Sequence, residues 1–165
     1  MGAGKSTVGR RLAKILGREF VDSDAEIERR TGASIPLIFE LEGEAGFRMR
    51  EKAAIAELAQ HRDIVLATGG GVVLDPDNRR CLAEHGFVVY LQTSVDEQLH
   101  RTGGNSHRPL LQTGDPHSRL TGLLEVRDPL YREVADFIVS TDGRSVYAVV
   151  RHILRHLGPR RPDVR

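Results

Sequence analysis

The chain has 165 residues, of which 39% are hydrophobic and 28% charged, and this composition excludes a disordered chain. A formal net charge of +1 and only 5% aromatic residues argue against a nucleic-acid-binding protein. The single cysteine, Cys81, excludes an internal disulfide, and no apolar run is long enough to span a membrane. We therefore expect one cytoplasmic, monomeric domain with neither nucleic acid nor membrane as a partner.

The first predicted element is a phosphate-binding loop, because Gly4-Lys5-Ser6 stands directly before a helical pattern. In such loops backbone N–H groups bind phosphate oxygens, the lysine reaches the β and γ phosphates, and the serine hydroxyl binds Mg²⁺. The full signature, G-x-x-x-x-G-K-S/T, would need a further glycine upstream of Met1. The sequence thus predicts a site for a triphosphate and Mg²⁺ from an incomplete motif.

In the first half of the chain, the spacing of the apolar residues mainly predicts helices. A helix is predicted from Ser6 to Gly17, and further helices at 25–31, 34–41 and 44–59. The short apolar run Phe20-Val21 interrupts them and predicts a buried strand that ends in two aspartates.

The second half alternates strands with helices. Apolar runs at 64–67, 87–91 and 137–139 predict strands buried on both faces. Helices are predicted at 75–84, at 94–103, from about Ser118 with a disturbance at Pro129, and at 146–157. Residues 103–116 are predicted to form a long irregular loop, which in a compact domain is usually functional. This alternation indicates an α/β fold with a parallel sheet covered by helices on both sides.

Three polar motifs fall at the carboxyl ends of predicted strands, where parallel sheets bind their ligands. They are the phosphate loop, the pair Asp22 and Asp24, and the glycine triplet Gly69–Gly71. Three successive glycines are costly to order, so they indicate a close approach by a ligand or by backbone, although a flexible turn is the alternative.

The two aspartates lie on nearly the same side of their strand, because side chains alternate along it. Two close carboxylates repel each other unless a cation or a proton lies between them. We interpret Asp22 as a ligand of Mg²⁺ together with Ser6, and Asp24 as the acceptor of a hydrogen bond from a substrate hydroxyl. The alternative is that the pair only caps the next helix.

Four arginines, at 48, 101, 108 and 127, stand near these motifs. Each alone is compatible with a solvated surface. Near a triphosphate, guanidinium groups give bidentate recognition of phosphate and carboxylate groups. Phosphoryl transfer needs positioning and charge neutralisation above all, so the pattern favours transfer to a small, anionic hydroxyl acceptor.

The motifs in this order resemble the shikimate kinase family, and the resemblance covers residues 1 to about 157. It rests on the segments 2–7, Asp22-Ser23-Asp24, Gly46-Phe47-Arg48, Thr68-Gly69-Gly70-Gly71, 101–111 and Arg127-Asp128-Pro129-Leu130-Tyr131. It implies a three-layer P-loop kinase fold similar to nucleoside monophosphate kinases, with the parallel strand order 2-3-1-4-5. It also implies transfer of the γ-phosphate of ATP to the 3-hydroxyl of shikimate, in the route to chorismate and aromatic amino acids.

The resemblance assigns roles residue by residue. The catalytic residues it implies are Lys5, Asp24 and Arg108. Those for ATP are Gly2, Ala3, Gly4, Lys5, Ser6, Thr7, Arg101, Arg108 and Arg144. Those for shikimate are Asp24, Arg48, Gly69, Gly70, Gly71 and Arg127, and those for Mg²⁺ are Ser6 and Asp22. It implies a single domain over 1–158, a lid at about 103–116 and a polar tail at 159–165.

The beginning of the chain departs from the family pattern. Family members carry further residues there, which form an apolar strand at the centre of the sheet and supply the first loop glycine. The resemblance therefore implies that this first strand is absent from residues 1–165 and that Met1 is not the natural start. A gluconate kinase-like enzyme and a non-catalytic nucleotide-binding fragment are the alternatives. Arg48 and Arg127, as a pair of carboxylate ligands, argue against the first; the intact Asp24 argues against the second.

Overall fold

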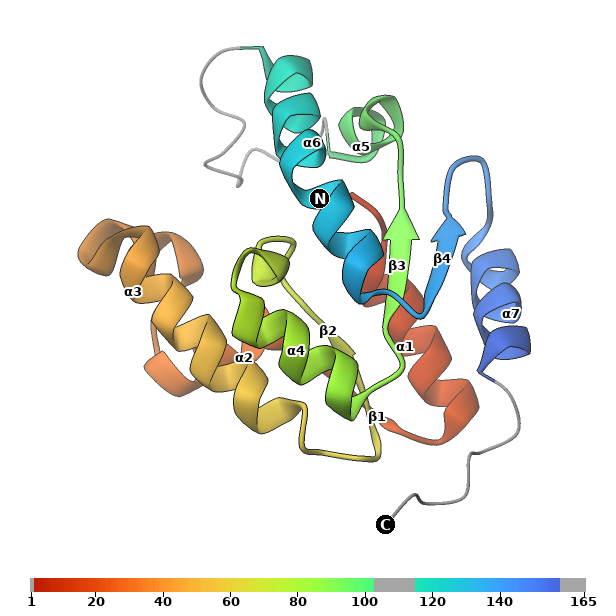
Figure 1. The fold of residues 1–165 in the computed structure, drawn as a ribbon, viewed down its shortest axis with the longest axis horizontal. Coiled ribbons are helices and arrows are strands. Elements are labelled where there is room, and N and C mark those ends of the chain that lie inside the picture. Colours follow the sequence, from red (N-terminus) through yellow and green to blue (C-terminus); the bar gives the residue numbers. More distant parts are fainter. Residues whose placement is uncertain (1, 103–114, 158–165) are drawn as a thin grey trace.

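The computed structural model describes residues 2–102 and 115–157, and it confirms an α/β fold of short parallel strands among helices (Figure 1). Arg108, most of the expected lid and the expected tail lie outside the described residues. The elements are α1 (Lys5–Leu16), β1 (Glu19–Asp22), α2 (Ser23–Thr31), α3 (Ile35–Leu58), β2 (Ile64–Ala67), the 3₁₀ turn η1 (Val72–Leu74), α4 (Pro76–His85), β3 (Val89–Gln92), α5 (Val95–Thr102), α6 (Pro116–Val134), β4 (Phe137–Ser140) and α7 (Val146–His156).

Helix α6 differs from the sequence prediction at its start and in its middle. It begins two residues before Ser118, because the Asp115 carboxylate accepts hydrogen bonds from the N–H groups of His117 and Ser118. The expected disturbance does not end it, and the helix continues through Pro129 to Val134. Proline removes one backbone hydrogen bond, whereas Leu130 and Tyr131 beside it pack against a buried apolar cluster.

Strand β3 begins two residues later than predicted. The backbone N–H of Val88 donates to the Asp136 carboxylate at 2.7 Å, so this residue pairs with the connection before β4. Phe87 remains 43% exposed, ahead of the strand. Phe87 and Val88 are as apolar as the strand residues that follow, so apolar character alone did not show that β3 begins at Val89.

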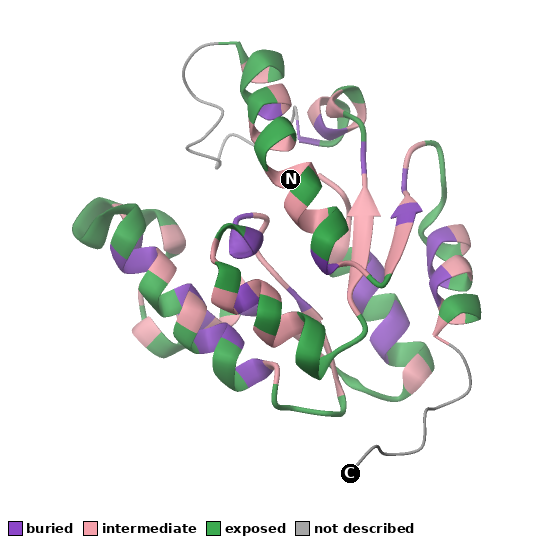
Figure 2. Ribbon diagram, viewed as in Figure 1, coloured by how far each residue is buried: buried purple, intermediate pink, exposed green. Residues whose placement is uncertain are grey.

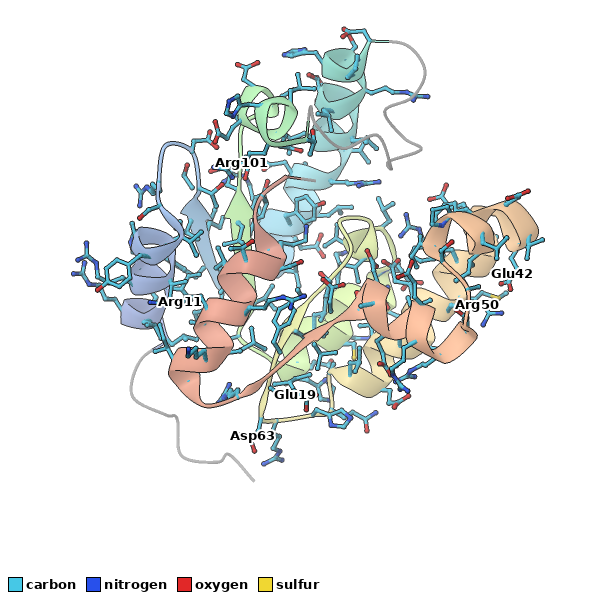
Figure 3. All side chains as sticks on the ribbon, turned by 180° about the vertical axis from the view of Figure 1, so that it is seen from behind. Arg11, Glu19, Glu42, Arg50, Asp63 and Arg101 are labelled. Atoms are coloured by element: carbon cyan, nitrogen blue, oxygen red, sulfur yellow. The ribbon has the colours of Figure 1, made fainter. Side chains whose placement is uncertain are left out.

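The two helices predicted at 34–41 and 44–59 form one long element, α3, with a kink at Gly43. This glycine has a φ of 69°, in the left-handed region that other residues rarely adopt. The kink brings Glu42 and Arg50 together as an ion pair of 2.7 Å, on the arm of the molecule at the far side of Figure 3 from α7. Helix α3 thus turns back across α2 and holds its carboxyl-terminal part against the sheet.

The described strands form two parallel pairs. In one, Phe20 of β1 is opposite Val65 of β2, and in the other Tyr90 of β3 is opposite Ile138 of β4. Among the described residues, no strand joins β2 to β3. An apolar cavity of about 280 Å³ lies between the pairs, lined by both strands, α1 and α7. Accordingly, most strand residues are only half-buried (Figure 2).

Three apolar clusters hold the helices on the strands. One joins α1 and α7 with β4, one joins α2 with α3, and one joins α3 with η1 and the end of α6. Close packing explains Gly9 of α1, because a Cβ there would lie 2.6 Å from the ring of Phe20. No helix in the described ranges is long and apolar enough to cross a bilayer.

Candidate active site

The phosphate loop presents a helix N-terminus without a protein cap. Gly2 and Gly4 have φ values of 69° and 81°, which turn the chain into α1. Gly4 makes no side-chain cap, and the first turn of α1 has no acidic residue. The N–H groups of this turn and the positive end of the helix dipole therefore fit a bound phosphate.

Ser6 and Asp22 lie together beside this helix start. The Ser6 hydroxyl donates to Asp22 Oδ2 at 3.1 Å, while Asp22 Oδ1 accepts from the N–H groups of Asp24 and Ala25. The helix cap that was the alternative interpretation is thus present, made by Asp22 alone. Because the second carboxylate oxygen faces a hydroxyl, the pair offers the hard oxygen ligands that Mg²⁺ prefers.

Asp24 has a buried carboxylate oxygen, Oδ1, for which the described residues provide no hydrogen-bond partner. Burial raises the pKa of this carboxyl, the negative charge of Asp22 raises it further, and the charge of Lys5 opposes both. An unpartnered buried acceptor is costly, so it marks a place where a ligand hydroxyl or a proton belongs.

Glu51 is a residue of this site that the sequence interpretation missed. Its side chain is 1% exposed, with Oε2 accepting from Arg48 at 2.6 Å and Oε1 without a partner among the described residues. Burial raises the pKa of Glu51, and the charge of Arg48 opposes that rise. The available signal was a carboxylate four residues after Phe47, on the apolar stripe of a helix.

The glycine triplet is surrounded by side chains from α2, α3 and α6. A Cβ at position 69 would be 2.9 Å from Asp24 Oδ1 and 3.1 Å from Glu51 Oε1. A Cβ at position 71 would overlap the Arg48 guanidinium, and one at position 70 would lie 3.6 Å from Arg127 Nη1. None of the three has a positive φ. The space that the site side chains occupy therefore accounts for glycine here better than a flexible turn does.

The predicted arginines are distributed over three places. Arg48 and Arg127 both border the glycine triplet, from α3 and α6 respectively. Arg101 of α5 donates to the Gly2 carbonyl at 3.2 Å and to the Thr141 carbonyl at 2.9 Å, next to the phosphate loop (Figure 3). Arg144 is exposed and lies 3.2 Å from His152 Nδ1, in the connection between β4 and α7.

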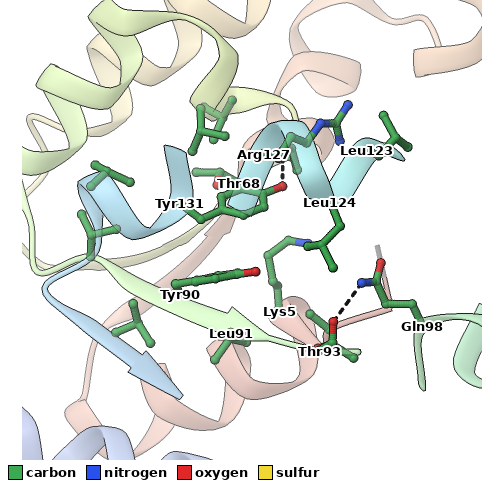
Figure 4. Close-up of a pocket in the computed structure, with 18 of the residues that line it drawn as sticks. Lys5, Thr68, Tyr90, Leu91, Thr93, Gln98, Leu123, Leu124, Arg127 and Tyr131 are labelled. Atoms are coloured by element: carbon green, nitrogen blue, oxygen red, sulfur yellow. Dashed lines mark hydrogen bonds between the residues drawn. The ribbon is translucent and has the colours of Figure 1, made fainter. Parts of the chain in front are cut away.

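A cavity of about 130 Å³ connects the phosphate loop with the glycine triplet. It is lined at the carboxyl ends of β2 and β3 by Lys5, Gly69, Gly70, Thr93, Arg127 and Tyr131, among others. Figure 4 shows the Lys5 side chain crossing this space below Arg127 and Tyr131. Lys5, from the start of α1, thus shares a cavity with Arg127 and with the glycine triplet, and the triplet in turn borders the buried carboxylates. Together with the α/β fold, this arrangement defines the class of P-loop phosphotransferases.

Comparisons with known proteins identify the family within this class. The family model described as shikimate kinase matches residues 1–158. The shikimate kinase of Methylococcus capsulatus is 60% identical over 154 residues, which are 93% of this chain and 86% of the relative. That of Halorhodospira halophila is 59% identical over 157 residues, which are 95% and 89% of the two chains.

Solved structures agree. Shikimate kinase from Acinetobacter baumannii in complex with shikimate superposes with a TM-score of 0.92 and 53% identity, over 95% of this chain and 88% of that one. The chain belongs to the shikimate kinase family. It is an ATP-using kinase of the shikimate pathway and of aromatic amino-acid biosynthesis, as the resemblance implied. The match excludes the gluconate kinase-like alternative.

Proposed function

We propose that Asp24 accepts the proton of the 3-hydroxyl of shikimate during phosphoryl transfer from ATP. The unpartnered, buried Asp24 Oδ1 next to Gly69 is the observation that carries this assignment. In the step, the hydroxyl oxygen bonds to the γ-phosphorus, the bond from that phosphorus to the ADP oxygen breaks, and the proton passes to Asp24. The raised pKa of Asp24 makes its carboxylate a stronger base than an exposed aspartate.

The acceptor is held by the residues around the glycine triplet. Arg48 and Arg127 bind the shikimate carboxylate, and the backbone of Gly69–Gly71 contacts the ring hydroxyls. Both guanidinium groups already border the triplet, which supports this arrangement. The relative from Acinetobacter baumannii is described in complex with shikimate and is 53% identical, which supports the same ligand here.

The nucleotide is held by the other side of the cavity. Residues 2–7 bind the phosphates, and Arg101 and Arg144 flank the adenine. Arg108, the remaining arginine that the resemblance implies for the phosphates, lies outside the described residues. Lys5 and the N-terminus of α1 stabilise the charge on the transferred phosphoryl group. Ser6 and Asp22 hold Mg²⁺, which neutralises charge on the phosphates when it is bound.

We also propose that the complete domain has a fifth, central strand between β2 and β3, giving the family order 2-3-1-4-5. The apolar cavity of about 280 Å³ between the two strand pairs supports this order. A parallel strand in that cavity would end at the carboxyl edge of the sheet, where the phosphate loop begins.

An assay of ADP release tests both proposals. Turnover should depend on shikimate and not on gluconate, and an upstream extension that supplies an apolar strand should raise both the melting temperature and the ATP affinity. Absence of shikimate-dependent turnover from the extended chain would refute the catalytic assignment. A cooperative melting transition with normal ATP affinity for residues 1–165 would refute the added strand.

A further inference from the structure

Tyr131 connects the glycine triplet to the helix that carries Arg127. Its hydroxyl donates a hydrogen bond to the carbonyl of Gly70, a residue 61 positions earlier in the chain. Arg127 and Tyr131 are four residues apart on α6, so they lie on the same face of the helix. A Cβ on Gly70 would lie 3.3 Å from the Tyr131 hydroxyl and 3.6 Å from Arg127 Nη1.

Among the described residues, the other hydrogen bonds of the triplet come from α2 and from the adjoining 3₁₀ turn. The N–H of Gly69 donates to Ser23 Oγ at 3.3 Å. The carbonyls of Gly69 and Gly71 accept from the N–H groups of Val72 and Leu74, within the adjoining 3₁₀ turn. Three successive glycines have no side chains that could fix their backbone. Within the described ranges, the hydrogen bond from the Tyr131 hydroxyl to the Gly70 carbonyl therefore fixes the position of the triplet relative to α6.

We infer that Tyr131 is a positioning residue, which fixes the distance between the Arg127 guanidinium and the Gly70 backbone and so tunes affinity for shikimate. This inference rests on the proposed function, in which those two groups bind one substrate molecule. Burial raises the pKa of the Tyr131 hydroxyl while the charge of Arg127 lowers it, and the group remains a proton donor at neutral pH.

Tyr90 provides a matched control. Its ring lies against that of Tyr131, with centroids 4.8 Å apart, so the two residues share the same packing. Its hydroxyl, however, donates to Asp128 Oδ1 at 2.9 Å and not to the triplet. Replacing either tyrosine by phenylalanine removes one part-buried, hydrogen-bonded hydroxyl and keeps the ring.

The test measures the shikimate KM and dissociation constant, the ATP KM, kcat and thermal melting for Tyr131→Phe and Tyr90→Phe in the full chain. Tyr131→Phe should raise the shikimate KM and dissociation constant about 5- to 10-fold, the loss expected from one hydrogen bond. Its kcat and ATP KM should stay within about 2-fold, a change too small to reflect a lost hydrogen bond. Tyr90→Phe should leave shikimate affinity unchanged.

Equal losses of shikimate affinity in both variants, or a lowered melting temperature without a change of affinity in Tyr131→Phe, would overturn the inference. Arg127→Ala, measured in parallel, separates it from the proposed function. If Arg127→Ala weakens shikimate binding and Tyr131→Phe does not, only the positioning role fails. If neither substitution changes shikimate binding, the assignment of the carboxylate site fails with it.

Discussion

The two sides of the cavity are built in different ways. The phosphate side, defined as residues 2–7 with Asp22 and Arg101, is mostly one contiguous segment at the start of α1. The acceptor side, defined as Asp24, Arg48, Glu51, Gly69–Gly71 and Arg127, gathers side chains from α2, α3 and α6 around a loop of glycines.

The difference lies in how charge is balanced before any ligand binds. On the acceptor side, Arg48 is held between Glu44 at 3.0 Å and the buried Glu51 at 2.6 Å. On the phosphate side, the N-terminus of α1 has no acidic residue in its first turn. Ion pairs therefore hold Arg48 on the acceptor side, whereas the N-terminus of α1 on the phosphate side is suited to bind an anion.

The largest effect is expected from Asp24→Asn, which removes the proposed base and keeps the shape of the side chain. Turnover should fall by about 10²- to 10⁴-fold, the usual contribution of a positioned base. The melting temperature should hold or rise, because the folded protein no longer has to accommodate a buried carboxylate whose pKa is raised. Steady-state kinetics and calorimetry measure both; a variant that keeps most of its turnover would contradict the assignment.

Arg127→Ala should act mainly on binding. Losing a charge-assisted contact to the shikimate carboxylate should raise KM for shikimate about 10- to 100-fold, with a smaller change in kcat. Arg132→Ala is the matched control, because Arg132 lies on the same helix and pairs with Asp128 at 2.6 Å, away from the triplet. Equal effects of the two substitutions would show that α6 as a whole, and not Arg127, governs binding.

Substitutions at Asp22 separate its two roles on the phosphate side. Asp22→Ala removes the cap of α2 and should cost about 1 kcal/mol of unfolding free energy. Asp22→Asn keeps a capping oxygen, so it should preserve stability while raising the Mg²⁺ concentration needed for half-maximal activity. If Asp22→Asn shows a normal Mg²⁺ dependence, Asp22 serves only as a cap.

The smallest effect is expected in the pH dependence of stability. Asp24 and Glu51 have raised pKa values in the folded protein, so the folded state holds more protons than the unfolded chain just above the ordinary pKa values of 3.8 and 4.5. Their contribution to stability therefore falls as the pH rises from about 4 through the raised pKa values. Glu51→Gln should flatten this slope in chemical denaturation across that range. An unchanged slope would mean that Glu51 has the same pKa in the folded and unfolded states, which would contradict the raised pKa.

The sequence predicted most residues of both sides, but it predicted the phosphate side more completely than the acceptor side. The phosphate side follows from Gly4-Lys5-Ser6 and a helical pattern, because a contiguous motif specifies its own local geometry. Asp24, Arg48 and Arg127 were named from residue types and spacing, and the ordered motifs of the family supplied their roles toward shikimate. Glu51 and the Tyr131 hydroxyl were missed, because each acts through a partner that only tertiary packing brings near.

The boundaries of helices and strands were also predicted well only where they depend on neighbouring residues. The helix predicted at 75–84 is present as α4, and the Asp75 carboxylate caps its start by accepting from the N–H group of Asp77, a contact between neighbouring residues. Pro129 was expected to disturb α6, but the packing of the residues beside it outweighs one missing hydrogen bond. Val88 was predicted to be a strand residue, but its N–H group donates to the Asp136 carboxylate and the strand begins at Val89.

The sequence by itself determined the alternation of helices and strands, the phosphate loop and the residue types of a phosphotransferase. These depend on local spacing and on chemistry that a short motif carries alone. Only the tertiary structure decided why positions 69–71 are glycine, which carboxylates are buried without partners, and how Tyr131 ties Gly70 to α6. The physical reason is that burial and contact distance arise from elements far apart in the chain, and no local pattern encodes them.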